Sequence, residues 1–199
     1  MSKPIPGMLT GDQALERLIE GNKRYAMSRQ KHPHQGPTRR AELCGGQNPF
    51  AVILGCADSR IPPELIFDQG LGDLFVVRVA GNIIDDVVLG SIEYAALHLC
   101  TPLIIVLGHS QCGAISATVQ GEEFEGHLSS LATAIQPVLN TIQASPGERV
   151  DQTAKANAKM ISEKIRQSTP VLSRLVGEAG LKVIAAFYDL DTGLVEILI

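Results

Sequence analysis

Hydrophobic and polar positions along the chain change from a helical to an alternating α/β pattern near residue 50. Before that point, apolar residues recur near helical spacing from 10 to 28, which predicts a helix that Thr10 or Asp12 can cap. Residues 30–37 are polar and contain prolines, which favours an extended connection, and a short helix is predicted over 38–44. The first part of the chain is therefore expected to form an N-terminal helix and arm.

Three short apolar runs follow, at 51–54, 74–79 and 103–107. Continuous apolar runs of this length are typical of strands that are buried on both faces of a sheet. Residues 84–99 repeat their apolar positions near helical spacing, which predicts a helix between the second and third strands. Strands that alternate with helices favour a largely parallel sheet.

The last third of the chain is expected to begin with a loop around residues 122–127 and to continue with one or two helices between 128 and 176. Two closing strands are predicted at 182–188 and 194–199, joined by a hairpin turn. The prediction is a single α/β domain over 1–199, with a mostly parallel central sheet flanked by helices and an N-terminal helix and arm over 1–37.

Composition and charge narrow the range of functions that this protein can have. The chain has 199 residues, of which 45% are hydrophobic and 4% aromatic, and 17 basic against 21 acidic residues give a net charge of −4. Without a basic stripe, nucleic acid binding has little support. Residues 1–9 lack the apolar core of a secretory signal, and no apolar run is long enough to cross a membrane. We therefore expect a soluble cytoplasmic protein, in which the four cysteines are better candidates for thiolate ligands than for a disulfide framework.

Three residues that can bind a metal follow two of the predicted strands. Cys56 stands just beyond the first strand, and His109 and Cys112 stand just beyond the third. Ligands gather at the carboxyl ends of parallel strands, and two thiolates with one imidazole suit Zn²⁺. Three protein ligands leave a fourth position open, as in catalytic zinc sites. Taken singly, each cysteine could equally be a small core residue, and Cys44 and Cys100 lie in no motif.

Asp58 and Arg60 lie directly after the first candidate ligand, Cys56. On an extended turn, residues i and i+2 can project to the same side, so we expect these two side chains to pair. A carboxylate beside zinc can bind the metal or accept a hydrogen bond from a zinc-bound hydroxide. An arginine that grips the carboxylate with two hydrogen bonds favours the second arrangement.

The motifs Cys-Ala-Asp-Ser-Arg at 56–60 and His-Ser-Gln-Cys-Gly at 109–113 resemble those of the β-class carbonic anhydrases. The resemblance covers nearly the whole chain. It implies the mostly parallel α/β fold of that family and one Zn²⁺ per chain. The implied reaction is the reversible hydration of carbon dioxide to bicarbonate and a proton, by attack of zinc-bound hydroxide. Obligate homodimers, often joined into homotetramers or larger assemblies of dimers, are also implied.

The same resemblance implies a substrate pocket that neither composition nor spacing reveals. It is lined by Gln47, Phe75 and Tyr94, with Ala80 and the backbone of Gly113 at further positions. Some of these residues come from the neighbouring subunit in the family, which places the active site at the subunit interface. An aromatic wall accommodates small apolar carbon dioxide, and an amide donor can polarise one of its oxygens.

Other interpretations of the same residues stay open at this point. Some relatives on this scaffold hydrolyse carbonyl sulfide or carbon disulfide, and a non-catalytic protein that binds zinc or bicarbonate could keep the fold. One family subgroup has an inhibitory bicarbonate site that includes a tryptophan, but Ile53 occupies that position here, although Arg78 and Tyr188 match. We therefore expect Arg60 to hold Asp58 off the metal at neutral pH.

Overall fold

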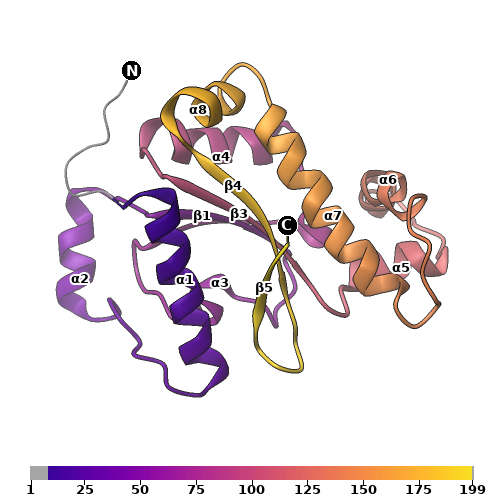
Figure 1. Ribbon diagram of the computed structural model, residues 1–199, viewed down its shortest axis with the longest axis horizontal. Helices are drawn as coiled ribbons and strands as arrows, with labels where there is room; N and C mark the ends of the chain where they lie inside the picture. Colours follow the sequence, from indigo (N-terminus) through magenta and orange to yellow (C-terminus); the bar gives the residue numbers. More distant parts are fainter. Residues whose placement is uncertain (1–8, 199) are drawn as a thin grey trace.

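A five-stranded sheet forms the centre of the computed structural model, which describes residues 9–198 (Figure 1). The strand order is β2-β1-β3-β4-β5, in which the first four strands are parallel and β5 is antiparallel to β4. The strands are β1 (Ala51–Gly55), β2 (Leu74–Arg78), β3 (Leu103–His109), β4 (Lys182–Tyr188) and β5 (Val195–Leu198). The predicted α/β class with a mostly parallel sheet is confirmed.

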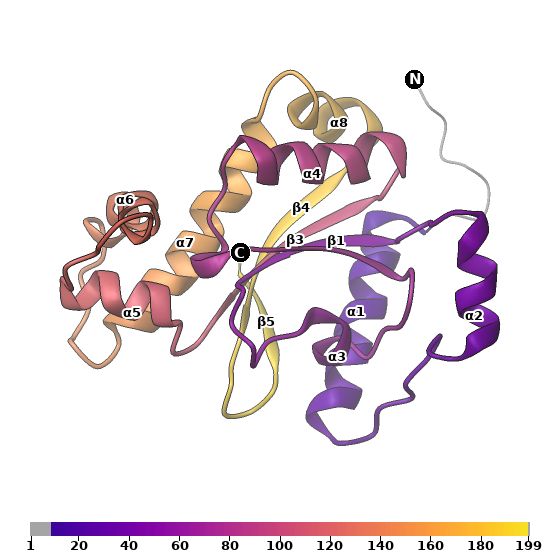
Figure 2. The same ribbon diagram turned by 180° about the vertical axis from the view of Figure 1, so that it is seen from behind.

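Helices cover both faces of the sheet. The helices of the described chain, with the two short 3-10 helices labelled η, are α1 (Gly11–Ala26), α2 (Pro37–Glu42), η1 (Leu43–Gly45), α3 (Pro63–Ile66), η2 (Ala80–Asn82), α4 (Asp86–His98), α5 (Gly113–Gln120), α6 (Leu128–Leu139), α7 (Arg149–Gln167) and α8 (Leu172–Ala179). Helices α1 and α3 lie on one side of the sheet, while α4 and α8 lie on the other (Figures 1 and 2). Helix α7 packs along β3 and β4, and α5 and α6 stand beyond the carboxyl ends of the strands.

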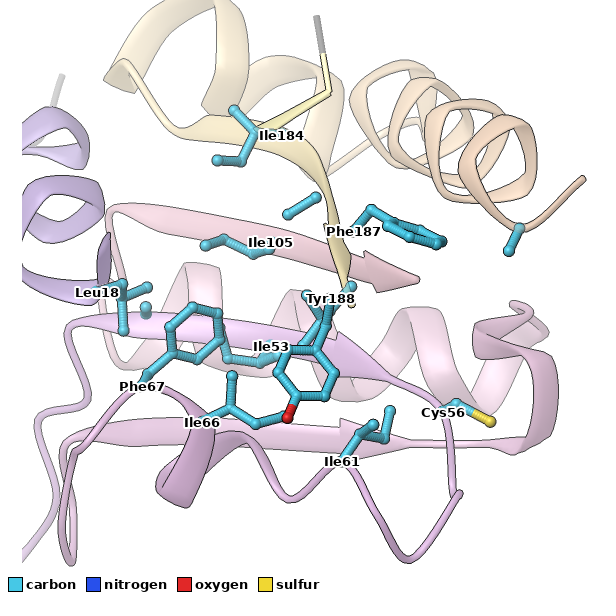
Figure 3. Packing of buried hydrophobic residues seen from close by; sticks show 14 of the residues in the cluster. Leu18, Ile53, Cys56, Ile61, Ile66, Phe67, Ile105, Ile184, Phe187 and Tyr188 are labelled. Atoms are coloured by element: carbon cyan, nitrogen blue, oxygen red, sulfur yellow. The ribbon is translucent and has the colours of Figure 1, made fainter. Parts of the chain in front are cut away.

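The alternation of side chains along each strand builds a separate core on each face. Ile53 and Ile105 belong to the cluster that includes Leu18 of α1, whereas Val52 packs on the opposite face with residues of α4. Figure 3 shows the first of these clusters, with the sulfur of Cys56 at its margin. Because both faces are covered, the strands carry the continuous apolar runs that predicted them.

Helix α1 confirms the predicted N-terminal helix and shows which of the two candidate residues caps it. Thr10 accepts a hydrogen bond from the backbone of Gln13, whose side chain accepts one in return from the backbone of Thr10, so Thr10 rather than Asp12 is the cap. Further along, the buried amide of Asn22 donates to the carbonyls of Ile66 and Gly193. These bonds join α1 to α3 and to the turn that precedes β5.

The connection predicted over 30–37 forms no helix or strand from 27 to 36, but α1 ends two residues earlier than predicted and Pro37 already begins α2. Hydrogen bonds join this arm to the loop that leads into β2. The carboxylate of Asp68 accepts backbone hydrogen bonds from Lys31 and His32 and forms an ion pair with Arg24. The ring of His34 lies 2.8 Å from the Asp73 carboxylate. The arm is therefore fixed to the body of the domain by two buried carboxylates.

One or two helices were predicted between 128 and 176, and this number is wrong, because the described chain has three helices between residues 128 and 179. Pro146 and Gly147 separate α6 from α7, residues 168–171 separate α7 from α8, and α8 ends at Ala179 rather than before 176. Pro137 lies in the last turn of α6 without ending that helix. Helices α3 and α5 were not predicted, since four and eight residues are too few for a clear periodic pattern. Within residues 9–198, no helix is both long and apolar enough to cross a membrane.

Candidate metal centre

Three buried side chains meet at the carboxyl ends of two neighbouring strands. Cys56 is the first residue after β1, His109 is the last residue of β3, and Cys112 precedes α5. The parallel pairing of β1 with β3 brings these strand ends together. The two sulfurs and a ring nitrogen of His109 all lie within 4.8 Å of one another. The structure thus assembles the three residues that the sequence predicted as metal ligands.

The geometry and protonation of the cluster fit a tetrahedral zinc ion. The two sulfurs are 4.0 Å apart, close to the roughly 3.8 Å expected for two thiolates at ~2.3 Å from one tetrahedral ion. The Nδ1 atom of His109 lies 2.9 Å from the carbonyl oxygen of Ser110, which can only accept, so Nδ1 carries the proton. His109 Nε2 is buried and has no hydrogen-bond partner among the described residues. Its lone pair is therefore available as a ligand.

Hydrogen bonds to the sulfur of Cys56 favour its thiolate. The contact with Cys112, assisted by His109 and by the backbone N–H groups of Asp58 and Gly81, lowers the pKa of Cys56 to about 4 against the opposing effect of burial. The Gly81 nitrogen lies 3.2 Å from this sulfur. The same sulfur contact and burial raise the pKa of Cys112. The two opposite shifts favour one thiolate and one thiol in the pair, and a metal ion bound by both sulfurs would require loss of the remaining proton.

Asp58 and Arg60 pair as predicted. Arg60 donates from Nε to Oδ1 of Asp58 at 2.9 Å and from Nη2 to Oδ2 at 2.7 Å, and its backbone nitrogen also donates to Oδ1. These bonds lower the pKa of Asp58 to about 2. Arg60 Nη2 also donates to the carbonyl oxygen of Gln111, at 3.2 Å, so the pair is tied to the loop between His109 and Cys112.

Asn157, for which no role was predicted from the sequence, supports the cluster through Gly81. The side-chain amide of Asn157, fully buried on α7, donates to the carbonyl oxygen of Gly81 at 2.9 Å. Gly81 has a φ of 71°, and a Cβ there would lie 3.1 Å from a methyl of Ile135, so glycine suits this position. No sequence motif marks Asn157, since its partner lies 76 residues away.

The predicted pocket residues divide into two groups. Ala80 and Gly113 lie beside the cluster, because Ala80 precedes the glycine that donates to Cys56 and Gly113 follows Cys112. Phe75 and Tyr94 contact each other, with ring centroids 6.3 Å apart, but Phe75 lies near the amino end of β2. Gln47 is exposed and precedes β1, at the opposite end of the strand from Cys56. A single chain therefore does not bring Gln47 and Phe75 to the metal cluster.

A comparison with protein-family models gives one match, described as carbonic anhydrase, over residues 51–195. The matched region contains Cys56, Asp58, Arg60, His109 and Cys112. This chain belongs to the carbonic anhydrase family. The reaction common to that family is the hydration of carbon dioxide.

Curated relatives agree with this assignment over most of their length. The chain is 41% identical over 185 residues to carbonic anhydrase 2 of Mycobacterium tuberculosis, covering 90% of this chain and 89% of that protein. It is 38% identical over 188 residues to a carbonic anhydrase of Mycolicibacterium smegmatis, covering 92% and 91%.

Several solved structures that resemble this chain are β-carbonic anhydrases. One is a tetrameric enzyme of the ascomycete Sordaria macrospora, with a TM-score of 0.76 and 29% identity over 92% of this chain and 96% of that one. Another is a β-carbonic anhydrase of Aspergillus fumigatus, with a TM-score of 0.74 and 27% identity over 92% and 90%. The resemblance that the sequence motifs indicated is thereby confirmed, including the β class.

Proposed function

We propose that this chain binds one Zn²⁺ through Cys56, His109 and Cys112 and catalyses the reversible hydration of carbon dioxide to bicarbonate and a proton. The observation that carries the proposal is that two buried sulfurs and a ring nitrogen of His109 lie within 4.8 Å of one another, while His109 Nε2 has no hydrogen-bond partner among residues 9–198. Three protein ligands leave one coordination position open for chemistry. Zinc in such a site supplies a hydroxide nucleophile at neutral pH by lowering the pKa of water.

Asp58 and Arg60 complete the catalytic group in this proposal. The Asp58 carboxylate is ionised at neutral pH and accepts a hydrogen bond from the reacting oxygen, which orients that oxygen towards carbon dioxide. Arg60 occupies both carboxylate oxygens and so opposes direct binding of Asp58 to the metal. This arrangement, with Asp58 held off the metal, is the one that we expect at neutral pH.

The substrate pocket is proposed to form between two copies of the chain. Ala80 and Gly113 contribute from the chain that supplies the ligands, while Gln47, Phe75 and Tyr94 include residues contributed by the partner. Two features support this assignment: β2 is an edge strand, and apolar side chains are exposed on the neighbouring α4. The exposed fractions on α4 are 77% for Val87, 49% for Tyr94 and 39% for Leu97. The proposed assembly is a cytoplasmic homodimer or a dimer of dimers.

A comparison of substrates tests the proposed activity. The purified, zinc-replete protein is assayed with carbon dioxide, carbonyl sulfide and carbon disulfide, and its zinc content is measured on the same sample. We expect catalysed hydration of carbon dioxide at one zinc per chain, and much slower turnover of the two sulfur compounds. Faster turnover of a sulfur compound would assign a different hydrolase activity to the same site. Zinc-replete protein without catalysis would indicate a binding protein.

A further inference from the structure

The loop between His109 and Cys112 contains a residue in a conformation that L-amino acids rarely adopt. Gln111 has a φ of 55°, in the left-handed region, although it carries a side chain. Such a conformation is strained and persists only where neighbouring groups hold it. Gln111 lies one residue before Cys112 and two after His109, so its backbone determines where the two side chains point. Whatever holds Gln111 therefore acts on the metal site.

The backbone N–H and the carbonyl oxygen of Gln111 are each hydrogen-bonded to a side chain from another part of the chain. Its backbone N–H donates to Oδ1 of Asp151 at 3.1 Å. Its carbonyl oxygen accepts from Nη2 of Arg60 at 3.2 Å. The same guanidinium grips Asp58. A continuous set of hydrogen bonds therefore runs from Asp151 through the strained residue and Arg60 to the carboxylate beside the metal cluster.

Helix α7 provides a rigid base for Asp151, which lies in its first turn. This helix packs closely on β3, because Gly108 has no side chain: a Cβ at Gly108 would lie 3.1 Å from the carbonyl oxygen of Ala154. Ala154 is fully buried. The position of Asp151 relative to His109 is thus set by backbone packing one residue before the ligand. A fixed acceptor of this kind can hold a strained loop at a defined place.

We propose that Asp151 is a positioning residue of the metal site. By accepting the Gln111 N–H, it holds the His109–Cys112 loop in its left-handed turn and, through Gln111 and Arg60, helps to hold Asp58. This inference rests on the proposed zinc function, because its consequence is an effect on zinc affinity. Groups that orient metal ligands from outside the coordination sphere commonly contribute tenfold or more to metal affinity.

A purely local role for Asp151 makes different predictions. An acidic residue in the first turn of a helix interacts favourably with the helix dipole. Asp86, exposed in the first turn of α4, has the same relation to its own helix and provides a matched control. If Asp151 acted only in this way, loss of its charge would reduce stability slightly and leave zinc affinity unchanged.

The experiment compares the wild-type holoenzyme with Asp151→Ala, Asp151→Asn and Asp86→Ala. Zinc dissociation constants are measured by competition with a chelator, thermal unfolding is followed on the same samples, and Co²⁺-substituted proteins are compared by absorption spectroscopy. We expect Asp151→Ala to weaken zinc binding by about tenfold or more and to alter the Co²⁺ spectrum. Asp151→Asn should restore both properties, because the asparagine oxygen can accept the same hydrogen bond from Gln111. Asp86→Ala should bind zinc like the wild type.

Zinc affinity equal to wild type in Asp151→Ala, or equally weakened in Asp151→Ala and Asp151→Asn, would overturn the inference. If Asp151→Ala does not fold, Asp151→Ser keeps a polar first-turn residue that is too short to reach the loop, and the same criteria apply to it. In the double variant Gln111→Gly with Asp151→Ala, glycine adopts the left-handed turn without strain, so part of the lost affinity should return. Wild-type protein that binds no zinc would instead refute the proposed function itself.

Discussion

Arg60 contacts both carboxylate oxygens of Asp58, at 2.9 and 2.7 Å. The pair begins two residues after the candidate ligand Cys56, and the backbone of Arg60 adds a third bond to the same carboxylate. A carboxylate held in this way remains ionised and has little freedom to move onto a metal ion. In the proposed zinc site, Asp58 can therefore orient the reacting oxygen without itself binding the metal.

Replacement of Arg60 should therefore impair catalysis more than metal binding. In Arg60→Ala we expect kcat at saturating zinc to fall by about tenfold or more, because Asp58 loses its restraint. Zinc should bind more weakly but still be retained, because Gln111 loses one of its two supports and keeps its bond to Asp151. Arg60→Lys should recover only part of the activity, since an ammonium group cannot make the two parallel bonds of a guanidinium. Stopped-flow hydration kinetics with zinc analysis on each variant measure both effects. Wild-type kcat in Arg60→Ala would contradict the role assigned to the pair.

The pKa of Asp58 gives a prediction about stability in acid. Hydrogen bonds from Arg60 lower this pKa from its ordinary value of 3.8 to about 2. A carboxyl group whose pKa is lower in the folded state stabilises the fold fully above its unfolded pKa, and this contribution is lost as the pH falls through the folded value. The difference in unfolding free energy between wild type and Asp58→Asn should therefore shrink as the pH is lowered from about 4 towards 2. Denaturant titrations at several pH values measure it, and a difference that grows towards pH 2 would be inconsistent with the pairing.

Two of the four cysteines should be needed for metal binding, and the other two should not. Cys56 and Cys112 are buried in the metal cluster, whereas Cys44 and Cys100 are exposed. We expect Cys56→Ala and Cys112→Ala to lose bound zinc and activity, because a buried two-ligand site cannot retain a catalytic metal. Cys44→Ser and Cys100→Ser should keep both. Full zinc content in either alanine variant would show that the metal is held elsewhere.

Asn157 should stabilise the fold and the metal site together. Its amide donates to the Gly81 carbonyl, and the N–H of Gly81 in turn donates to the sulfur of Cys56. Asn157→Ala leaves a buried carbonyl without this donor, which typically costs about 1–3 kcal/mol of unfolding free energy. Chemical denaturation measures this loss. The exposed Asn140 provides a control, because Asn140→Ala should change stability by less than about 0.5 kcal/mol.

The strands and the meeting of the three candidate metal ligands could be predicted from the sequence for related physical reasons. Short apolar runs mark strands that are buried on both faces, and parallel strands end at the same edge of a sheet. The positions of Cys56 and His109 at two such strand ends were therefore enough to predict that they meet, and the spacing of Asp58 and Arg60 indicated their pairing. The predicted helices at 10–28 and 84–99 are confirmed with slightly shorter bounds, because their apolar faces repeat over several turns.

The supporting contacts could not be predicted because they depend on tertiary packing. Asp151 and Asn157 lie on a helix that reaches the site only after α7 docks on β3 and β4. Nothing in the residues around them differs from an ordinary amphipathic helix. The strained turn at Gln111 was also missed, since glutamine gives no signal for a positive φ. Helix α5 was missed because it begins directly after Cys112 with no side-chain cap.

The most direct test of the proposed function is carbon dioxide hydration by one protein sample before and after removal of zinc. Stopped-flow rates are measured on the zinc-replete protein, on the same sample after chelation, and after zinc is restored, with metal content determined at each stage. We expect a rate far above the uncatalysed reaction at one zinc per chain, loss of that rate with the metal and its recovery on reconstitution. A zinc-replete protein that hydrates carbon dioxide no faster than buffer would contradict the assigned function.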